Sequence, residues 1–359
     1  MQKGFSLLSK QPVALQVGYT FYIYRVKILV IRFSSIGDIV LTTPVLRCIR
    51  RQMPDAEIHY LTKAAFAPLL SANPHIKKIH KLEDDLEALL PELKAEKFDF
   101  IADLHHNIRT ARVKAALGVK SASFPKKNFE KWVLVNLRVN LMPDESIVAR
   151  YFEAVKPIGI HNDGAGLEYY IPELAKITND DIPTSHWTGY VACVIGGSYN
   201  TKKFPVEQWR AFCEKVPFPV ILLGSAEERE EGREIASLDP IKIYNSCGKF
   251  NINESAALIQ RARVVVTNDT GLMHVAAAFQ KPIISLWGNT SPELGMFPYY
   301  GSNNLKSRVS PLSVLMENKK LGCHPCSKLG YNKCPRGHFK CMKKLDASLI
   351  AEHVKKLWS

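Results

Sequence analysis

One segment of the chain predicts a buried strand followed by polar residues of the types that can bind a phosphate group. Residues 263–267 are short, apolar and largely β-branched, which predicts a strand, and residues 268–271 predict a polar turn. Asp269 is expected to cap the following helix, which places Thr270 at its N-terminus. Free N–H groups and the positive end of the helix dipole favour a phosphate there, and His274 follows one turn later. An ordinary capped helix with a surface histidine is the alternative.

A carboxylate follows a second buried-strand pattern near the start of the chain. Residues 27–33 predict a strand, residues 34–38 a turn and residues 39–51 a helix, with Pro44 near its first turn. Asp38 is therefore expected just beyond the carboxyl end of a strand, where open α/β sheets bind their ligands. A helix-capping aspartate is the alternative interpretation.

Together these two segments resemble glycosyltransferase family 9, the family of the heptosyltransferases of lipopolysaccharide core synthesis. Residues 34–38 (Ser-Ser-Ile-Gly-Asp) are similar to the family's N-terminal motif, and residues 268–278 (Asn-Asp-Thr-Gly-Leu-Met-His-Val-Ala-Ala-Ala) to its C-terminal motif. The second motif is the more specific, and the pair in this order is a stronger signal than either alone. The resemblance runs from about Val26 to the C-terminus.

Strand-like and helix-like segments alternate along the chain, which predicts parallel sheets covered by helices on both faces. The predicted strands fall into two series, over residues 27–33, 57–61 and 98–104, and over residues 190–195, 220–223, 263–267 and 282–287. Two Rossmann-like parallel-sheet domains that face each other across a cleft make the GT-B architecture. The resemblance implies the same α/β fold.

A stretch rich in proline, glycine and asparagine separates the two series and predicts a domain boundary. We expect a poorly ordered extension over residues 1–26, with no signal-peptide cleavage site, and a C-terminal helix over residues 346–359 that crosses back to the first domain, by analogy with other GT-B proteins. The predicted units between them are an acceptor-side domain over residues 27–165, a linker over 166–188 and a donor-binding domain over 189–345 with a cysteine-rich basic segment at 319–344.

Three loops predicted in the second domain contain residues suited to binding a phosphate or a nucleotide. Residues 196–205 combine glycines with hydroxyl and ammonium donors, among them Ser198. The resemblance implies a lysine three residues before Pro205 at the donor phosphates, which is Lys202, with Lys203 as the near alternative. A solvated pair of lysines on a loop is the other interpretation.

The other two loops are also assigned through the resemblance. It points to Glu227, within one residue, as a carboxylate for the ribose hydroxyls, although a first-turn glutamate that complements the helix dipole is equally consistent. It implies contacts to the diphosphate and the donor sugar from Asp269, Thr270, Gly271 and His274.

Glycosyl transfer from a nucleotide sugar needs one base and stabilisation of the leaving diphosphate. Asp38 is the predicted base of an inverting single displacement. A free aspartate has a pKa near 3.9 and is a weak base at neutral pH, which suffices if the proton moves late. The chain has no strict Asp-x-Asp motif, so we expect no metal cofactor in catalysis.

The acceptor is expected to bind the first domain. Residues 103–109 follow a predicted strand and open a helix, and His105, Asn107 and Arg109 could hold a phosphorylated or carboxylated sugar. Helix capping by Asn107, with a solvated histidine, is the alternative.

Four cysteines near the C-terminus have a spacing that suits zinc. They are Cys323, Cys326, Cys334 and Cys341, with His324 and His338 as spare ligands, and cysteine-rich tails occur in some relatives. A structural zinc or disulfides are favoured over a catalytic role. The other cysteines lie in core-like contexts, which is typical of a reduced, cytoplasmic protein.

The net charge of +14 indicates an anionic partner. We expect an ADP-sugar donor, a phosphorylated lipopolysaccharide inner-core acceptor and peripheral contact with an anionic membrane surface, with no transmembrane segment and no nucleic acid. Another nucleotide sugar or glycan acceptor is the first alternative. A basic nucleic-acid-binding protein with a C-terminal zinc site is the second, and it leaves both loop motifs unexplained.

Overall fold

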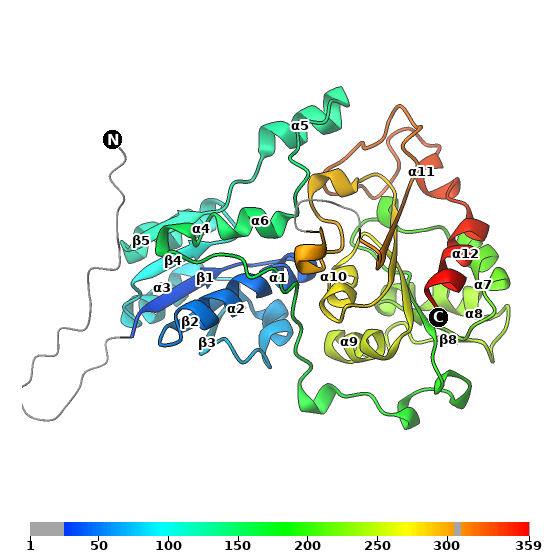
Figure 1. Cartoon of the computed structure of the whole chain (residues 1–359), viewed down its shortest axis with the longest axis horizontal. Helices are drawn as coiled ribbons and strands as arrows, with labels where there is room; N and C mark the ends of the chain where they lie inside the picture. Colours follow the sequence, from blue (N-terminus) through cyan, green and yellow to red (C-terminus); the bar gives the residue numbers. More distant parts are fainter. Residues whose placement is uncertain (1–24, 305–309, 359) are drawn as a thin grey trace, which may run out of the picture.

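A computed structural model describes residues 25–304 and 310–358 of the chain. The predicted N-terminal extension lies almost entirely outside these residues. The described chain forms two α/β lobes that lie side by side (Figure 1). None of its helices is long and apolar enough to cross a membrane.

The first lobe is built on a five-stranded parallel sheet. The strand order is β3-β2-β1-β4-β5. The strands are β1 (Lys27–Ile31), β2 (Glu57–Lys63), β3 (Lys78–Leu82), β4 (Phe100–Asp103) and β5 (Lys120–Ser123). Its helices are α1 (Ile36–Val40), α2 (Thr43–Gln52), α3 (Leu86–Ala95), α4 (Ile108–Leu117), α5 (Asn128–Leu137) and α6 (Ile147–Phe152).

The second lobe has a six-stranded parallel sheet in the order β11-β10-β9-β6-β7-β8. The strands are β6 (Val191–Val194), β7 (Val220–Leu223), β8 (Ile243–Asn245), β9 (Val264–Asn268), β10 (Ile283–Trp287) and β11 (Ser313–Glu317). Its helices are α7 (Val206–Lys215), α8 (Arg229–Ala236), α9 (Ile252–Arg261), α10 (Gly271–Ala278), α11 (Lys340–Lys343) and α12 (Ala347–Leu357). All seven predicted strands are thereby confirmed.

The single helix predicted over residues 39–51 is wrong, because the chain forms α1 and α2 with a break between them. Pro44 has no N–H to donate to the carbonyl of Val40, and its ring would clash there in a continuous helix. The hydroxyl of Thr43 donates to that carbonyl instead, at 2.7 Å. Pro44 lies in the first turn of α2, where the missing N–H is tolerated.

The C-terminal helix does not cross back to the first lobe. Its buried residues Ile350, Ala351 and Val354 join the core of the second sheet, and α12 packs against α7 and β10. The ring of Trp358 stacks on Phe218 with 3.8 Å between centroids. The apolar stripe of α12 therefore covers its own sheet, and the expectation drawn by analogy is wrong.

The two lobes are joined by a shared core. One hydrophobic cluster contains Val30 of the first sheet, Val194 of the second and Met273 of α10. The contact between α1 and α10 holds the carboxyl ends of the two central strands, β1 and β9, close to each other. The loops that follow β1 and β9 therefore lie next to each other, where the two lobes meet.

Candidate functional site

The two sequence motifs meet at a contact between glycines. A Cβ atom on Gly271 would lie 2.5 Å from the side chain of Ile36 and 2.9 Å from the backbone nitrogen of Gly37. A Cβ atom on Gly37 would lie 2.6 Å from the ring of His274. Only glycine allows this approach, which brings the first turn of α1 against the first turn of α10.

Asp38 lies in the first turn of α1, where its two carboxylate oxygens have different partners. Oδ2 accepts a hydrogen bond from the Ser35 hydroxyl at 2.8 Å, a local contact of the helix-capping type. Oδ1 lies 2.7 Å from Nη2 of Arg32 and 3.3 Å from the hydroxyl of Tyr151. The side chain is 17% exposed, so the carboxylate is held in position and is still reachable.

Arg32 keeps Asp38 ionised. Burial disfavours the charged carboxylate, but the Arg32 guanidinium and the hydrogen bonds from Ser35 outweigh it and hold the pKa of Asp38 below its ordinary value. Arg32 is itself fixed by hydrogen bonds to the backbone carbonyls of Ser34 and Leu104, at 2.7 and 2.6 Å. Sequence reasoning missed this residue, although a cation inside an otherwise apolar strand pattern is a usable signal.

The first turn of α10 offers polar groups with no partner in the described part of the chain. Thr270, rather than Asp269, is the N-cap residue, and its buried hydroxyl makes no hydrogen bond there. Nδ1 of His274 is buried and unpaired among the same residues. Burial lowers the pKa of His274 to about 4 despite the nearby Asp269 and Asp38, so the imidazole is neutral at pH 7.

The predicted cap at Asp269 is wrong because its carboxylate is used elsewhere. Oδ2 of Asp269 lies 2.7 Å from Nζ of Lys202 and accepts the hydroxyl of Thr290 at 2.8 Å. Lys202 thereby reaches the N-terminus of α10. Gly197 lies close to both Lys202 and Thr270, so the loop that carries Lys202 lies beside the N-terminus of α10.

The two adjacent lysines, which the sequence left undecided, point to different carboxylates. Nζ of Lys203 lies 2.6 Å from Oε1 of Glu228, which is buried and also accepts hydrogen bonds from Ser225. Glu227 and Ser198 are exposed on their loops. The structure therefore places Lys202 at the α10 turn, and places Lys203 against the carboxylate one residue after the predicted Glu227.

On the first lobe, the structure brings one of the three predicted acceptor residues to Asp38. The ring of His105 packs edge-on against Phe33, and burial followed by the charge of Arg32 lowers its pKa to about 4. Asn107 caps α4, with its side-chain oxygen accepting from the backbone N–H of Thr110 at 3.0 Å, as the structural alternative anticipated. Arg109 is exposed, and no contact joins it to Asp38.

A second buried cation near Asp38 escaped the sequence analysis. Arg150 of α6 is 2% exposed, and its Nε and Nη1 groups have no hydrogen-bond partner within the described chain. Its remaining nitrogen donates to the carbonyl of Leu294 at 2.9 Å, which links the two lobes. Burial followed by the charge of Arg150 lowers the pKa of Lys131 on α5 to about 8. These cations provide anion-binding groups around Asp38.

The four C-terminal cysteines surround one small pocket, together with His338. Nε2 of His338 lies 3.7 Å from Sγ of Cys323. His324 is not a spare ligand, because its two ring nitrogens contact the carbonyl of Gly288 and the carboxylate of Glu317. Tyr331 of this segment exchanges hydrogen bonds with Thr201 at 2.8 to 3.1 Å. The cysteine segment therefore supports the loop that carries Lys202.

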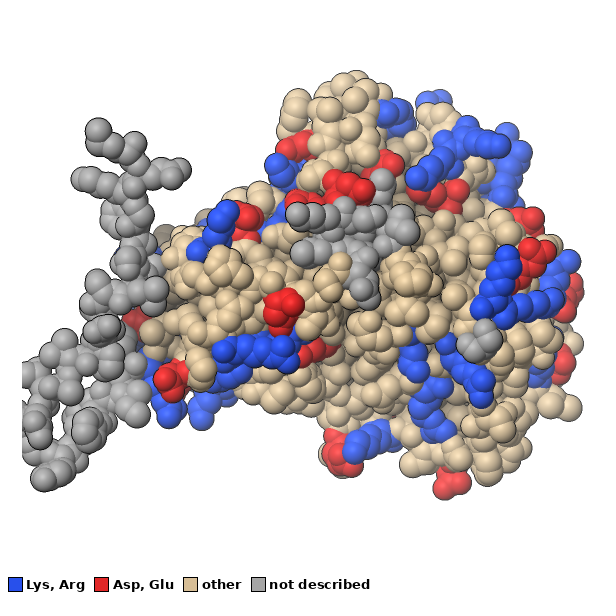
Figure 2. Space-filling model, viewed as in Figure 1, with Lys and Arg blue, Asp and Glu red and all other residues tan. Residues whose placement is uncertain are grey.

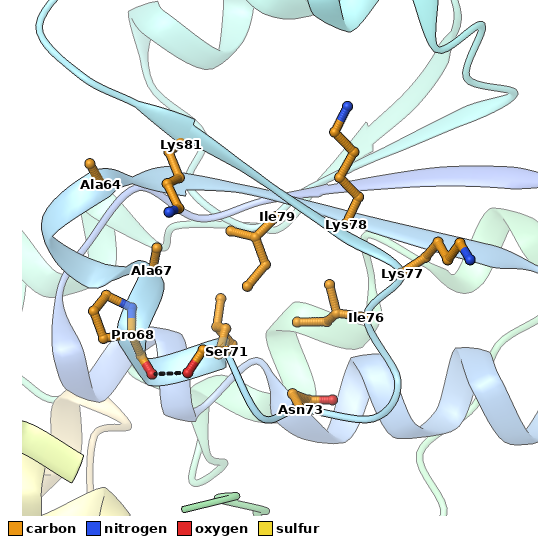
Figure 3. A pocket seen from close by; sticks show the side chains of 11 residues that line it. Ala64, Ala67, Pro68, Ser71, Asn73, Ile76, Lys77, Lys78, Ile79 and Lys81 are labelled. Atoms are coloured by element: carbon orange, nitrogen blue, oxygen red, sulfur yellow. Dashed lines mark hydrogen bonds between the residues drawn. The ribbon is translucent and has the colours of Figure 1, made fainter. Parts of the chain in front are cut away.

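Two other features lie away from these motifs. A pocket of about 500 Å³ opens beside the edge strand β3, and Figure 3 shows Ile76 and Ile79 lining it while Lys78 extends away. His59, His80 and Glu96 bring three ligand atoms within 4.8 Å of one another, but Glu96 is already paired with Lys27 and Lys78. Neither feature contains a residue of the two motifs.

Comparison with known proteins identifies the fold and the family. The model of glycosyltransferase family 9 (heptosyltransferase) matches residues 86–320, more than half of the chain. Lipopolysaccharide heptosyltransferase 2 of Escherichia coli is 25% identical over 74% of this chain and 84% of its own length, and lipopolysaccharide heptosyltransferase 1 of Campylobacter coli is 23% identical over the same shares.

Solved structures show the same two-lobed architecture. ADP-heptose lps heptosyltransferase II of E. coli aligns with a TM-score of 0.67 at 20% identity, over 92% of this chain and 98% of that one. A family 9 glycosyltransferase of Veillonella parvula aligns with a TM-score of 0.68 at 19% identity, over 92% and 97%. The fold is GT-B, as predicted, and the chain belongs to glycosyltransferase family 9 and is a glycosyltransferase.

Proposed function

We propose that this enzyme transfers a heptose from ADP-heptose to the lipopolysaccharide inner core, with inversion at the anomeric carbon. Its E. coli and C. coli relatives are named as lipopolysaccharide heptosyltransferases, and one solved relative is named for ADP-heptose. The observation that carries the proposal is the contact of the two motifs. It sets an ionised carboxylate, Asp38, beside a helix N-terminus suited to a leaving diphosphate.

The donor diphosphate would bind between Lys202 and the first turn of α10. Thr270 and Gly271 offer backbone N–H groups, and the unpaired Thr270 hydroxyl and His274 ring add neutral polar contacts. Lys202 would exchange part of its contact with Asp269 for phosphate oxygens. Ser198 and Lys203 lie on the same loop as Lys202 and would also contact the donor. Glu227, in the short 3-10 helix after β7, would bind the ribose hydroxyls.

In the proposed reaction, a hydroxyl of the acceptor attacks the anomeric carbon of the heptose. The new carbon–oxygen bond forms on one face as the bond to the diphosphate breaks on the other, and ADP leaves with the bonding electrons. Asp38 takes the hydroxyl proton late, when the developing positive charge at the sugar has made that proton acidic. Lys202 and the α10 turn stabilise the charge on ADP.

The acceptor would bind on the first lobe, in reach of Asp38. Arg150 and Lys131 supply positive charge for a phosphorylated inner-core sugar, and His105 supplies a neutral ring. Asn107 uses its oxygen as a helix cap, which leaves its amide N–H groups, and Arg109 stands on the exposed rim. We place the enzyme in the cytoplasm, in peripheral contact with an anionic membrane that carries the acceptor, and we expect no nucleic-acid partner.

Transfer is expected to proceed without an added divalent cation. We assign the neutralisation of the leaving diphosphate to Lys202 and the α10 dipole, so the rate without added metal should stay within about threefold of the rate with Mg²⁺. Initial rates measured with and without Mg²⁺ and Mn²⁺ check this. A strict requirement for either ion would contradict the assigned roles.

We further propose that the cysteine pocket holds a structural zinc ion. Cys323, Cys326, Cys334 and Cys341 are of the type and spacing that bind zinc, and they line one pocket. Metal analysis of the purified protein should find about one zinc per chain. Cys326→Ser should lower that content and weaken donor binding through the Thr201 contact.

The control is Cys213→Ser, which removes a buried thiol from the core of the second lobe. This variant should keep its metal. A wild-type protein without zinc, or equal zinc in the Cys326 variant, would refute the metal site.

Calorimetric titration with ADP-heptose tests the donor assignment. We expect selective binding of the ADP-sugar over UDP- and GDP-sugars. Lys202→Ala should weaken binding by about 1.5–3 kcal/mol, roughly ten- to a hundredfold in Kd, because a charge-assisted contact is lost. Lys176→Ala, an exposed lysine paired with Glu173, is the matched control and should bind normally. If the enzyme preferred a UDP- or GDP-sugar, the assignment of ADP-heptose as the donor would be wrong.

A further inference from the structure

The helix α5 carries an exposed apolar surface that the reaction does not use. Five of its large apolar side chains, or of those just after it, are more than half exposed: Phe129 67%, Trp132 54%, Leu137 57%, Val139 51% and Leu141 52%. Burial of apolar groups is the main driving force for association, so several exposed large apolar side chains in one short segment indicate a binding surface. We call residues 126–141 the α5 lip.

The α5 lip is firmly attached to the body of the protein. Val133 and Leu134 on its inner side are buried, and Leu134 packs with Met142 and with Leu294 of the second lobe. The exposed side chains are therefore presented by an ordered helix with its own packing contacts. Figure 1 shows α5 projecting beyond both lobes, and Figure 2 shows mostly tan atoms over this projection.

Basic residues accompany the apolar ones. The lip contains the cations Lys126, Lys127, Lys131 and Arg138 and one carboxylate, Glu130, which lies 3.2 Å from Lys127. Aromatic and aliphatic side chains flanked by cations are typical of helices that lie in the interface of an anionic bilayer. A symmetric contact between two copies would instead bring these like charges together.

The inner side of the lip faces the reaction centre. Leu134 of the lip packs with Leu294, whose backbone carbonyl accepts a hydrogen bond from the buried Arg150 at 2.9 Å. Burial and the charge of Arg150 lower the pKa of Lys131 to about 8. The same segment that is exposed outward therefore borders the place where the acceptor would bind.

We infer that the α5 lip is the surface that docks the enzyme on an anionic lipid bilayer, with Phe129, Trp132 and Leu137 inserted among the lipids. This inference rests on the proposed function, which supplies a lipid-anchored acceptor. Docking by this surface brings the acceptor-binding side of Asp38 to the bilayer. An acceptor anchored in the membrane can then reach the Asp38 carboxylate while its lipid stays in the bilayer.

Vesicle flotation tests the inference. The full-length enzyme should float with vesicles of phosphatidylcholine and phosphatidylglycerol, and much less with phosphatidylcholine alone. The triple variant Phe129→Ser, Trp132→Ser, Leu137→Ser should lose about tenfold or more of this binding. The control triple variant Leu174→Ser, Ile241→Ser, Leu349→Ser changes exposed apolar residues elsewhere and should float like the wild type.

Two further readouts separate docking from folding and from catalysis. The lip variant should keep the transfer rate on a water-soluble, delipidated acceptor and lose rate on the same acceptor embedded in vesicles. Brominated lipids should quench the tryptophan fluorescence of the wild type, and the quenching should fall in Trp132→Phe while the vesicle binding remains.

Several results would overturn the inference. One is equal flotation of the lip variant and the wild type, and another is a loss of self-association in the lip variant without a change in vesicle binding. If the enzyme binds vesicles through the lip but transfers no heptose, the proposed function fails and the docking surface stands.

Discussion

Asp38→Asn is expected to lower kcat by about 10²–10⁴-fold, the usual contribution of a general base. The amide keeps the shape of the side chain but cannot take the proton of the acceptor hydroxyl. The donor should still bind with near wild-type affinity, because its phosphate contacts come from Lys202 and the α10 turn. Steady-state rates and donor titration of the same preparation check both parts.

Ser35→Ala is the matched control for Asp38→Asn. It removes a hydrogen-bond donor to Oδ2 of Asp38 but leaves the carboxylate and its ion pair with Arg32. Its loss of kcat should be less than about tenfold, because the carboxylate can still take the proton and still accepts a hydrogen bond from the backbone N–H of residue 35. An Asp38→Asn enzyme with normal kcat would remove Asp38 from the role of base.

Arg32→Met should move the acid limb of kcat/KM to higher pH and destabilise the fold. Burial raises the pKa of Asp38 and Arg32 opposes that effect, so removal of Arg32 should raise this pKa. The wild type should remain active down to about pH 4–5, since a lowered pKa leaves Asp38 ionised there. The loss of one partner of a buried ion pair costs about 3–5 kcal/mol.

The sign of the stability effect follows from the lowered pKa. A carboxylate with a depressed pKa in the folded state stabilises the wild type above the unfolded pKa of about 3.9, and this contribution is lost as the pH falls through the folded pKa. The Arg32 variant should therefore differ most from the wild type near neutral pH and less in acid. Denaturation midpoints at several pH values measure this.

Arg47→Met separates the two effects of the Arg32 variant. Arg47 is 1% exposed and pairs with Asp163 at 2.8 Å, away from the two motifs. Its removal should destabilise the protein about as much as Arg32→Met does, while the acid limb of kcat/KM stays at the pH of the wild type. The ion pair of Arg32 with Asp38 would not explain the position of the acid limb of kcat/KM if that limb shifted in Arg47→Met, or if it stayed in place in Arg32→Met.

The central strands could be predicted from the sequence because both of their faces are buried. Segments such as Val264–Asn268 and Ile283–Trp287 are rich in β-branched and other apolar residues, and every residue in them is buried. The strands that escaped prediction all lie at sheet edges, where one side is open and polar residues are tolerated: Lys78–Leu82, Lys120–Ser123, Ile243–Asn245 and Ser313–Glu317. Their sequences lack the buried-strand pattern for that physical reason.

The site was predictable where its residues sit in local motifs. Asp38 and the turn at residues 268–274 were found in this way, and the structure brings them together. Arg150 and Tyr151 escaped because their roles depend on contacts across the fold, such as the hydrogen bond of Tyr151 to Asp38 over 113 positions. The residues next to them in the sequence do not indicate which distant residues become their partners in the fold. Arg32 lies in the same strand–turn segment as its partner Asp38 and could have been found from the sequence.

The reaction proposed for this enzyme is inverting transfer of heptose from ADP-heptose to the inner core. The most direct test incubates the enzyme with ADP-heptose and an inner-core acceptor that lacks the heptose, and determines the anomeric configuration of the product by NMR. We expect one added heptose with the configuration opposite to that of the donor, and product formation about 10²–10⁴-fold slower with Asp38→Asn under the same conditions. A product that retains the donor configuration, or no transfer by the wild type, would contradict the proposed function.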